Sequence, residues 1–353
     1  MFVARHEVGA TTMDTARDSI ACANSLQRPA RPPATPGGWV GVDMAQTLSP
    51  WQRILRRMSN KVSPDPSQAP TWTSPLDRIP VFYTPLRVAE TDSFSPSAAK
   101  PKAAVASWLK LGIALSVIAP EPAKFEDFAR AHLANYVDAV LSCRSANGFG
   151  NHSKAVAESL PYTSGAMLAA AREALRNGRV AVAPCSGFHH AGYSHSNGYC
   201  TFNGLMVAAM ALHASGEAKR VGILDFDQHY GDGTDHIIDR MCVDWISHFS
   251  AGRHFHFQAE AGRFLSSIPD LVAGMKDCDA ILYQAGADPH IEDPLGGWLT
   301  TQQLHKRDRL VFETAAELRI PVAWNLAGGY KTPLRKVLTI HDNTMRACAG
   351  VHL

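Results

Sequence analysis

The stretch RVGILDFDQHYGDGTD, residues 220–235, joins an apolar run to a dense cluster of charge. Four carboxylates and one histidine lie within the twelve residues from Leu224 to Asp235. A short apolar run of this kind is typical of a buried strand. In open α/β sheets, ligands bind beyond the carboxyl ends of the strands. The stretch therefore indicates a strand whose end forms part of a site.

Three further apolar runs also end in polar or glycine-rich clusters, which read PCSGFHH, QAGADPHIEDP and LAGGY. Helical periodicity separates these runs. We predict strands over residues 179–184, 220–227, 280–286 and 321–329, and helices over residues 165–178, 203–216, 235–241 and 302–319. The strands are apolar on both faces, as in a parallel sheet covered by helices. The pattern predicts a single α/β domain with a central, mostly parallel β-sheet flanked by helices.

Composition excludes several classes of protein. The chain has 353 residues, of which 46% are hydrophobic, and this is enough for a large core. Its longest apolar stretch, at residues 109–120, is interrupted and far shorter than the roughly 20 residues of a membrane helix. A net charge of +2 without a long basic run argues against nucleic-acid binding. Seven scattered cysteines without a C-x-x-C pair fit a reducing compartment, so we expect a cytoplasmic protein.

The N-terminal part of the chain differs from the rest in composition. Residues 1–78 are rich in Pro, Ser and Ala and lack aliphatic periodicity, which is typical of a mostly disordered extension. Within it, residues 49–58 could form a short basic helix. The catalytic domain is expected to span residues 79–353.

Three side chains at two of the predicted strand ends suit a metal ion. Asp227 and His229 flank Gln228, so in a strand their side chains point to the same side, and Asp288 follows the next strand. Two carboxylates and one imidazole leave coordination positions open for water and substrate. The same residues also fit a strand end capped by solvated acids, so the motif alone leaves both interpretations open.

A tandem histidine pair follows the first of these strands. His189 and His190 lie in the loop GFHHAG, and each can be oriented by a carboxylate through its Nδ1–H. Asp225 and Asp232, in the same stretch as the metal candidates, are the available carboxylates. The alternative is a histidine pair that serves only packing.

These motifs together resemble the histone deacetylase family of metal-dependent deacetylases, which includes bacterial acetylpolyamine amidohydrolases. The resemblance is carried in order by SGFHHAGYSHSNGYCTFN, ILDFDQHYGDGT, QAGADPHIEDPLGG and LAGGY, with weaker support from VFYTPL, RAHLANYVDAV and LPYTSGAM. It extends from Ile79 to near the C-terminus. It implies an arginase/deacetylase-like fold and hydrolysis of an N-acetylated amine or peptide.

The resemblance implies specific roles for these residues. It assigns one zinc ion per chain to Asp227, His229 and Asp288. His190, paired with Asp232, is the implied general base, and His189, paired with Asp225, is the implied partner that stabilises charge.

The resemblance also implies a narrow substrate tunnel. Tyr330 would stabilise the oxyanion, Gly198 and Tyr199 would form the tunnel wall, and Leu295 would lie at its rim. Ala327 replaces a glycine found in many relatives, a change expected to tighten the turn before Tyr330.

Some properties stay open at this level. A structural potassium ion is doubtful, because its site would involve Asp225 and a later segment in which Ser247 and His248 align only loosely. The alternatives to a deacetylase are an arginase- or agmatinase-like manganese hydrolase, or a catalytically silent binding module. The partner is expected to be a small-molecule or peptide N-acetylated amine, with a small acylated amine favoured, and a homo-oligomer is possible.

Overall fold

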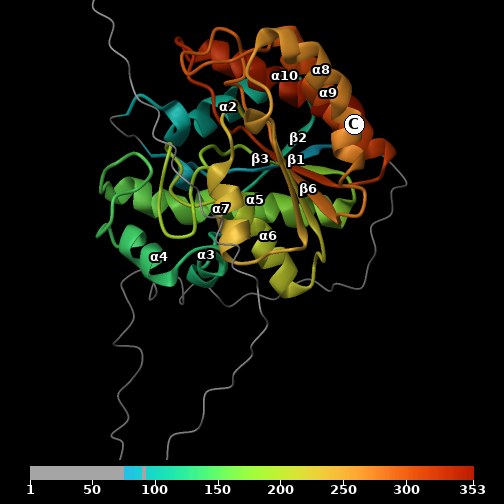
Figure 1. Cartoon of the computed structure of the whole chain (residues 1–353). Helices are drawn as coiled ribbons and strands as arrows, with labels where there is room; N and C mark the ends of the chain where they lie inside the picture. The colour runs from blue at the N-terminus through green and yellow to red at the C-terminus, as the bar shows by residue number, and fades with distance from the viewer. Residues whose placement is uncertain (1–74, 90–92) are drawn as a thin grey trace, which may run out of the picture. The chain divides into compact units, whose positions relative to one another are not determined.

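A single parallel sheet organises the computed structural model, which describes residues 75–89 and 93–353 (Figure 1). Within these residues the sheet has seven strands in the order β2-β1-β3-β7-β6-β4-β5. The strands are β1 (Ile79–Phe82), β2 (Leu115–Ile118), β3 (Val180–Ala183), β4 (Val221–Asp225), β5 (Ile246–Ser250), β6 (Ala280–Gln284) and β7 (Val322–Asn325). All neighbouring pairs are parallel. The predicted α/β fold is confirmed, with a sheet that is parallel throughout rather than mostly parallel.

Helices cover both faces of the sheet. The helices are α2 (Lys100–Trp108), α3 (Phe125–Ala131), α4 (Ala134–Leu141), α5 (Lys154–Asn177), α6 (Gly204–Ser215), α7 (Asp232–Arg240), α8 (Ala261–Ala273), α9 (Thr301–Glu317) and α10 (Arg335–His352). Figure 1 shows α8, α9 and α10 together on one side of the sheet and α5 and α6 on the other. Because both faces are covered, β1, β3, β4, β6 and β7 are buried along their full lengths.

The four strands predicted from the sequence are neighbours in the sheet. β3, β7, β6 and β4 lie side by side, and the register pairs Ala183 with Asn325 and Gln284 with both Asn325 and Asp225. Parallel strands end at the same edge of a sheet, so the polar clusters that follow these strands must meet there. This arrangement positions the candidate site.

Three strands were not predicted: β1, which lies inside the sheet, and β2 and β5, which are at its edges. β2 leaves Val117 and Ile118 partly exposed, and four of the five residues of β5 are only half-buried. Such strands lack the uninterrupted apolar run that identifies a central strand. Most of the expected N-terminal extension, including the helix considered at residues 49–58, lies outside the described residues, so the boundary at residue 79 stays a prediction.

A search of the described helices for a segment long and apolar enough to cross a membrane found none.

Candidate active site

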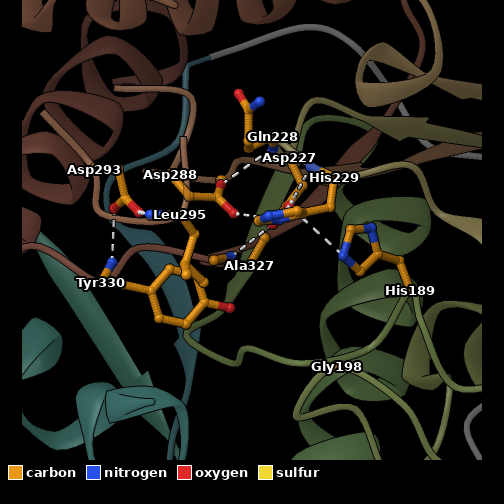
Figure 2. Close-up of polar contacts among 12 residues, drawn as sticks. His189, Gly198, Asp227, Gln228, His229, Asp288, Asp293, Leu295, Ala327 and Tyr330 are labelled. Atoms are coloured by element: carbon orange, nitrogen blue, oxygen red, sulfur yellow. Dashed lines mark hydrogen bonds and ion pairs between the residues drawn. The ribbon is translucent and has the colours of Figure 1, made fainter. Parts of the chain in front are cut away.

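Asp227, His229 and Asp288 meet at the carboxyl edge of the sheet. Nδ1 of His229 lies 3.2 Å from Oδ1 of Asp227 and 3.2 Å from Oδ2 of Asp288. Figure 2 shows both carboxylates turned toward the His229 ring. One donor atom from each residue lies within 4.8 Å of the other two, a spacing at which all three can bind a single metal ion.

The turn after β4 aims these ligands. β4 ends at Asp225, so Asp227 and His229 lie beyond the strand, and strand alternation is not what brings them together. Instead, Asp227 accepts hydrogen bonds from the backbone N–H of His229 at 3.0 Å and of Gly328 at 2.8 Å. Asp288 accepts one from the backbone N–H of Gln228 at 3.2 Å. Three chain segments are thus fixed to one another by the carboxylates themselves.

A glycine makes room for the ligands. A Cβ on Gly328 would lie 2.1 Å from Oδ2 of Asp288 and 2.8 Å from Oδ2 of Asp227. Contacts this short do not occur, so any side chain at residue 328 would displace a carboxylate. Gly328, the first glycine in LAGGY, is therefore required because its backbone packs against the candidate ligands.

The electrostatics of the three residues fit a cation. Burial and the nearby carboxylate of Asp227 raise the pKa of Asp288 to about 7. Hydrogen bonds to Asp227 and Asp288 raise the pKa of His229 to about 11. Oδ2 of Asp288 is buried, and among the described residues the His229 ring is the polar group paired with it. Negative charge that would hold a proton on His229 would equally hold a metal ion in its place, so the donor set fits the implied zinc.

Both histidines of the tandem pair contact the expected carboxylates. Nδ1 of His189 lies 2.8 Å from Oδ2 of Asp225, and Nδ1 of His190 lies 2.6 Å from Oδ1 of Asp232. Asp232 is the first residue of α7 rather than part of a loop. The His189 and His190 ring centroids are 4.1 Å apart, and the His190 and His229 centroids are 5.9 Å apart.

The two histidines differ in charge. Burial lowers the pKa of His189, but the carboxylates of Asp225 and Asp227 outweigh this effect and raise the pKa to about 9. Burial and the neighbouring His189 lower the pKa of His190, even though Asp232 opposes the shift. At neutral pH, His189 is therefore a cation and His190 a neutral imidazole able to accept a proton.

Tyr330 is held by contacts on both sides of its loop. Asp293 accepts hydrogen bonds from the backbone N–H of Tyr330 at 2.8 Å and of Leu295 at 3.1 Å (Figure 2). On the other side, the buried Lys100 Nζ donates to the carbonyl oxygens of Ala327 at 2.6 Å and Gly328 at 3.2 Å. Burial and the nearby acids raise the pKa of Tyr330, so its hydroxyl stays protonated and can donate.

The remaining predicted residues surround the same space. His189, Gly198, Asp227, Gly328 and Tyr330 all line one small cavity. The Tyr199 and Tyr330 ring centroids are 6.0 Å apart. Gly198 has a φ of +50° and lies against His190, where a Cβ would approach the ring to 2.5 Å. Leu295 is 40% exposed. The structure thus brings all the predicted site residues together.

Lys100 and Asp293 were not assigned roles from the sequence, although Asp293 lies within a quoted motif. Lys100 lies in the segment AAKPK, which gives no sequence signal of burial. Burial lowers the pKa of Lys100 to about 8, against the opposing effect of Asp288, Asp227 and Asp293. Lys100 is therefore a buried counter-charge for the acids of the site.

The segment that contains Ser247 and His248 forms β5, the neighbour of β4 in the sheet. The register of β4 and β5 pairs Asp225 with Ser250, whose hydroxyl donates to Oδ2 of Asp225 at 3.4 Å. His248 instead contacts Asp235, with Nδ1 2.6 Å from Oδ1. The potassium site itself stays a prediction.

Comparisons with known proteins agree with this geometry. A family model described as the histone deacetylase domain matches residues 96–261 and 263–345. Histone deacetylase 6 of Caenorhabditis elegans is 48% identical over 208 residues, covering 50% of this chain and 21% of that protein. Acetylpolyamine amidohydrolase 2 of Pseudomonas aeruginosa is 28% identical over 193 residues, covering 46% of this chain and 54% of that protein. The chain therefore spans only part of the length of these two relatives.

A solved structure supports the fold. The crystal structure of an acetylpolyamine aminohydrolase from Burkholderia pseudomallei matches with a TM-score of 0.59 at 17% identity, covering 77% of this chain and 99% of that chain.

Replacing Lys100 tests the buried counter-charge. Lys100→Met leaves the carbonyls of Ala327 and Gly328 without their donor and the site acids without a cation. We expect the free energy of unfolding to fall by about 3–5 kcal/mol, the usual cost of breaking a buried charge pair. Denaturant unfolding measures the loss. Lys102→Met, at an exposed position of the same helix, is the control and should change stability by less than about 0.5 kcal/mol. Equal effects at the two positions would contradict the role of Lys100.

Proposed function

Because this chain belongs to the histone deacetylase family, we propose that it is a zinc-dependent deacetylase that hydrolyses the amide bond of an N-acylated amine. One observation carries the proposal. The Asp227, His229 and Asp288 group lies at the same strand ends as two histidine–aspartate pairs and a tyrosine that lines the same cavity. Together these groups supply metal ligands, a proton acceptor and an oxyanion donor, which are the parts that amide hydrolysis needs.

In this proposal, Asp227, His229 and Asp288 hold one zinc ion. When bound, zinc would acidify water and polarise the acyl carbonyl. Backbone N–H groups already fix the carboxylates of Asp227 and Asp288, so the ligands are oriented before the metal binds.

His190 is proposed as the general base. Its lowered pKa leaves the imidazole neutral, and the bond from Nδ1 to Asp232 leaves Nε2 free to accept a proton from the attacking water. The water oxygen bonds to the acyl carbon, the carbon–nitrogen bond breaks, and His190 returns the proton to the leaving amine. His189, with its raised pKa, would place positive charge beside the negative charge that develops on the acyl carbon's oxygens.

Tyr330 is proposed to donate to the carbonyl oxygen as it becomes an oxyanion. Asp293 and Lys100 hold its loop from opposite sides, so the hydroxyl does not need to be repositioned during the reaction. A donor fixed in advance is the arrangement that favours the transition state over the ground state.

We favour a small acylated amine, such as an acetylpolyamine, as the substrate, with acetyl-lysine as the other class. The alignment with a bacterial acetylpolyamine amidohydrolase supports this choice. The low net charge of +2 gives no support for a nucleic-acid partner. An arginase-like centre with two manganese ions fits less well, because the described residues contain one three-ligand group of this kind. Every proposed role is filled by a chemically competent residue, so a silent binding module also fits less well.

Metal and substrate are tested together. The purified protein is expected to hold about one zinc per chain and to hydrolyse at least one of N-acetylputrescine, N-acetylspermidine and an acetyl-lysine peptide. Asp288→Ala removes a buried ligand and should lose both metal and turnover. Metal analysis and amine release measure the two outcomes. Two manganese ions per chain would contradict the proposal.

The histidines should differ in their effects. His190→Ala should lower kcat by about two to four orders of magnitude, the usual contribution of a positioned proton acceptor. His189→Ala should retain more activity, because that imidazole contributes charge rather than proton transfer. Steady-state kinetics of the two variants with equal zinc content measure the difference. Similar, mild losses would show that the pair serves packing.

Tyr330→Phe removes one hydroxyl and little volume. Loss of an oxyanion donor should lower kcat by about 10²- to 10³-fold and change KM much less. Zinc content and thermal stability should hold, and they are measured as controls. Near-normal turnover, or loss of metal together with unfolding, would make Tyr330 a structural residue.

A further inference from the structure

Another buried cation, Arg87, has no anionic partner among residues 75–89 and 93–353. It ends the short 3₁₀ helix Pro85–Arg87 and is 2% exposed. Its Nη1 donates to the carbonyl oxygen of Phe82 at 3.1 Å, whereas Nε and Nη2 have no hydrogen-bond partner within the described part of the chain. These two nitrogens form one edge of the guanidinium group, the edge that binds a carboxylate through two parallel hydrogen bonds.

The protein groups around Arg87 do not neutralise it. In the part of the chain that the structure describes, Arg87 takes part in no ion pair with a carboxylate. Cys185 and Tyr83 are close enough to feel its charge, but burial raises the pKa of both groups, so both are neutral at neutral pH. A buried charge left unpaired is strongly unfavourable, and proteins keep one where a ligand supplies the opposite charge.

Arg87 lines a small cavity of about 40 Å³, which we call the Arg87 pocket. Its wall carries the hydroxyl side chains of Ser97, Ser159, Thr163, Ser164, Ser186 and Thr201. The Ser186 hydroxyl is buried and, like the guanidinium edge, has no hydrogen-bond partner. Two sets of unused donors therefore lie on the wall of one pocket.

The Arg87 pocket adjoins the catalytic cavity. Gly187, which follows Ser186, lines both cavities. Tyr199, from the proposed tunnel wall, also lines the Arg87 pocket. A positively charged, hydroxyl-lined space therefore lies next to the catalytic cavity, where an acyl group longer than acetyl would need room.

We propose that the Arg87 pocket binds a carboxylate at the far end of the substrate's acyl group, so that the enzyme accepts amides of dicarboxylic acids such as succinyl amines. This inference rests on the proposed amide hydrolysis. The reaction balances as before, because water adds across the carbon–nitrogen bond and yields the free amine and the dicarboxylate. An acetyl group has no charge to meet Arg87, and a butyryl group of the same length as succinyl would bring a methyl group to the guanidinium edge.

Kinetics with matched acyl groups test the specificity. The zinc-loaded wild type is assayed with N-succinyl- and N-butyryl-lysine peptides of one sequence. We expect kcat/KM to be about tenfold to hundredfold higher for the succinyl peptide, the worth of charge-assisted hydrogen bonds. Arg87→Met should bring this ratio to about one. Arg78→Met replaces an exposed arginine directly before β1. This control variant should leave the ratio unchanged. A wild-type ratio near or below one overturns the proposal.

Binding without turnover separates this proposal from the proposed function. Thermal unfolding is followed with added succinate and with added acetate, each against chloride at equal ionic strength. Succinate should raise the Tm of wild type and not that of Arg87→Met, even if no N-acyl amine is hydrolysed. The absence of any succinate effect on wild type overturns the proposal. Acetate could instead stabilise wild type as much as succinate does, with no preference for the succinyl peptide in turnover. This result would show that the pocket binds the released carboxylic acid, and it would overturn the proposal that the pocket binds the acyl chain.

Discussion

Two buried carboxylates, Asp227 and Asp288, share one histidine nitrogen at the edge of the sheet, and their mutual repulsion is the constraint on which the surrounding structure depends. Like charges this close in a low-dielectric interior raise each other's cost of ionisation. The chain offsets this cost with backbone N–H donors from Gln228, His229 and Gly328. A metal ion bound by the same oxygens would remove the repulsion directly, which is why the site suits a cation.

Helices of one layer also help to hold the loops that carry these carboxylates. Lys100 from α2 reaches the LAGGY loop, and Arg307 from α9 donates to the carbonyl oxygens of Phe226 at 3.1 Å and Gly286 at 2.7 Å. These carbonyls follow β4 and β6, the strands that lead to Asp227 and Asp288. Arg307 is itself paired with the buried Asp308 at 2.8 Å. Two buried cations thus fix the loops that carry the acids, and they reach the sheet edge from helices whose other residues form the apolar core.

The sequence was enough to predict four of the five interior strands, all except β1, and the residues that follow them. Long apolar runs identify β3, β4, β6 and β7 because these strands are buried on both faces, and parallel geometry requires their ends to meet. The edge strands β2 and β5 escaped prediction because partial exposure mixes polar residues into them. Lys100 was missed for another reason. Its contacts with Ala327 and Gly328 span more than two hundred residues, and a lysine between an alanine and a proline has the same local pattern whether it is exposed or buried.

Lys100 and Arg87, two buried cations near the catalytic cavity, differ in the groups that surround them. Lys100 lies near Asp288, Asp227 and Asp293. These carboxylates supply its counter-charge and offset the free-energy cost of burying it, so no ligand is needed. Among the described residues, Arg87 has the Phe82 carbonyl and the Cys185 thiol beside it and shares a cavity wall with several hydroxyls, and none of these neutral groups cancels its charge. A fold that needed Arg87 only for packing would be better served by an apolar side chain of similar length. The retained charge therefore belongs to recognition, and the unused donors on its free edge specify a planar anion with two acceptor oxygens.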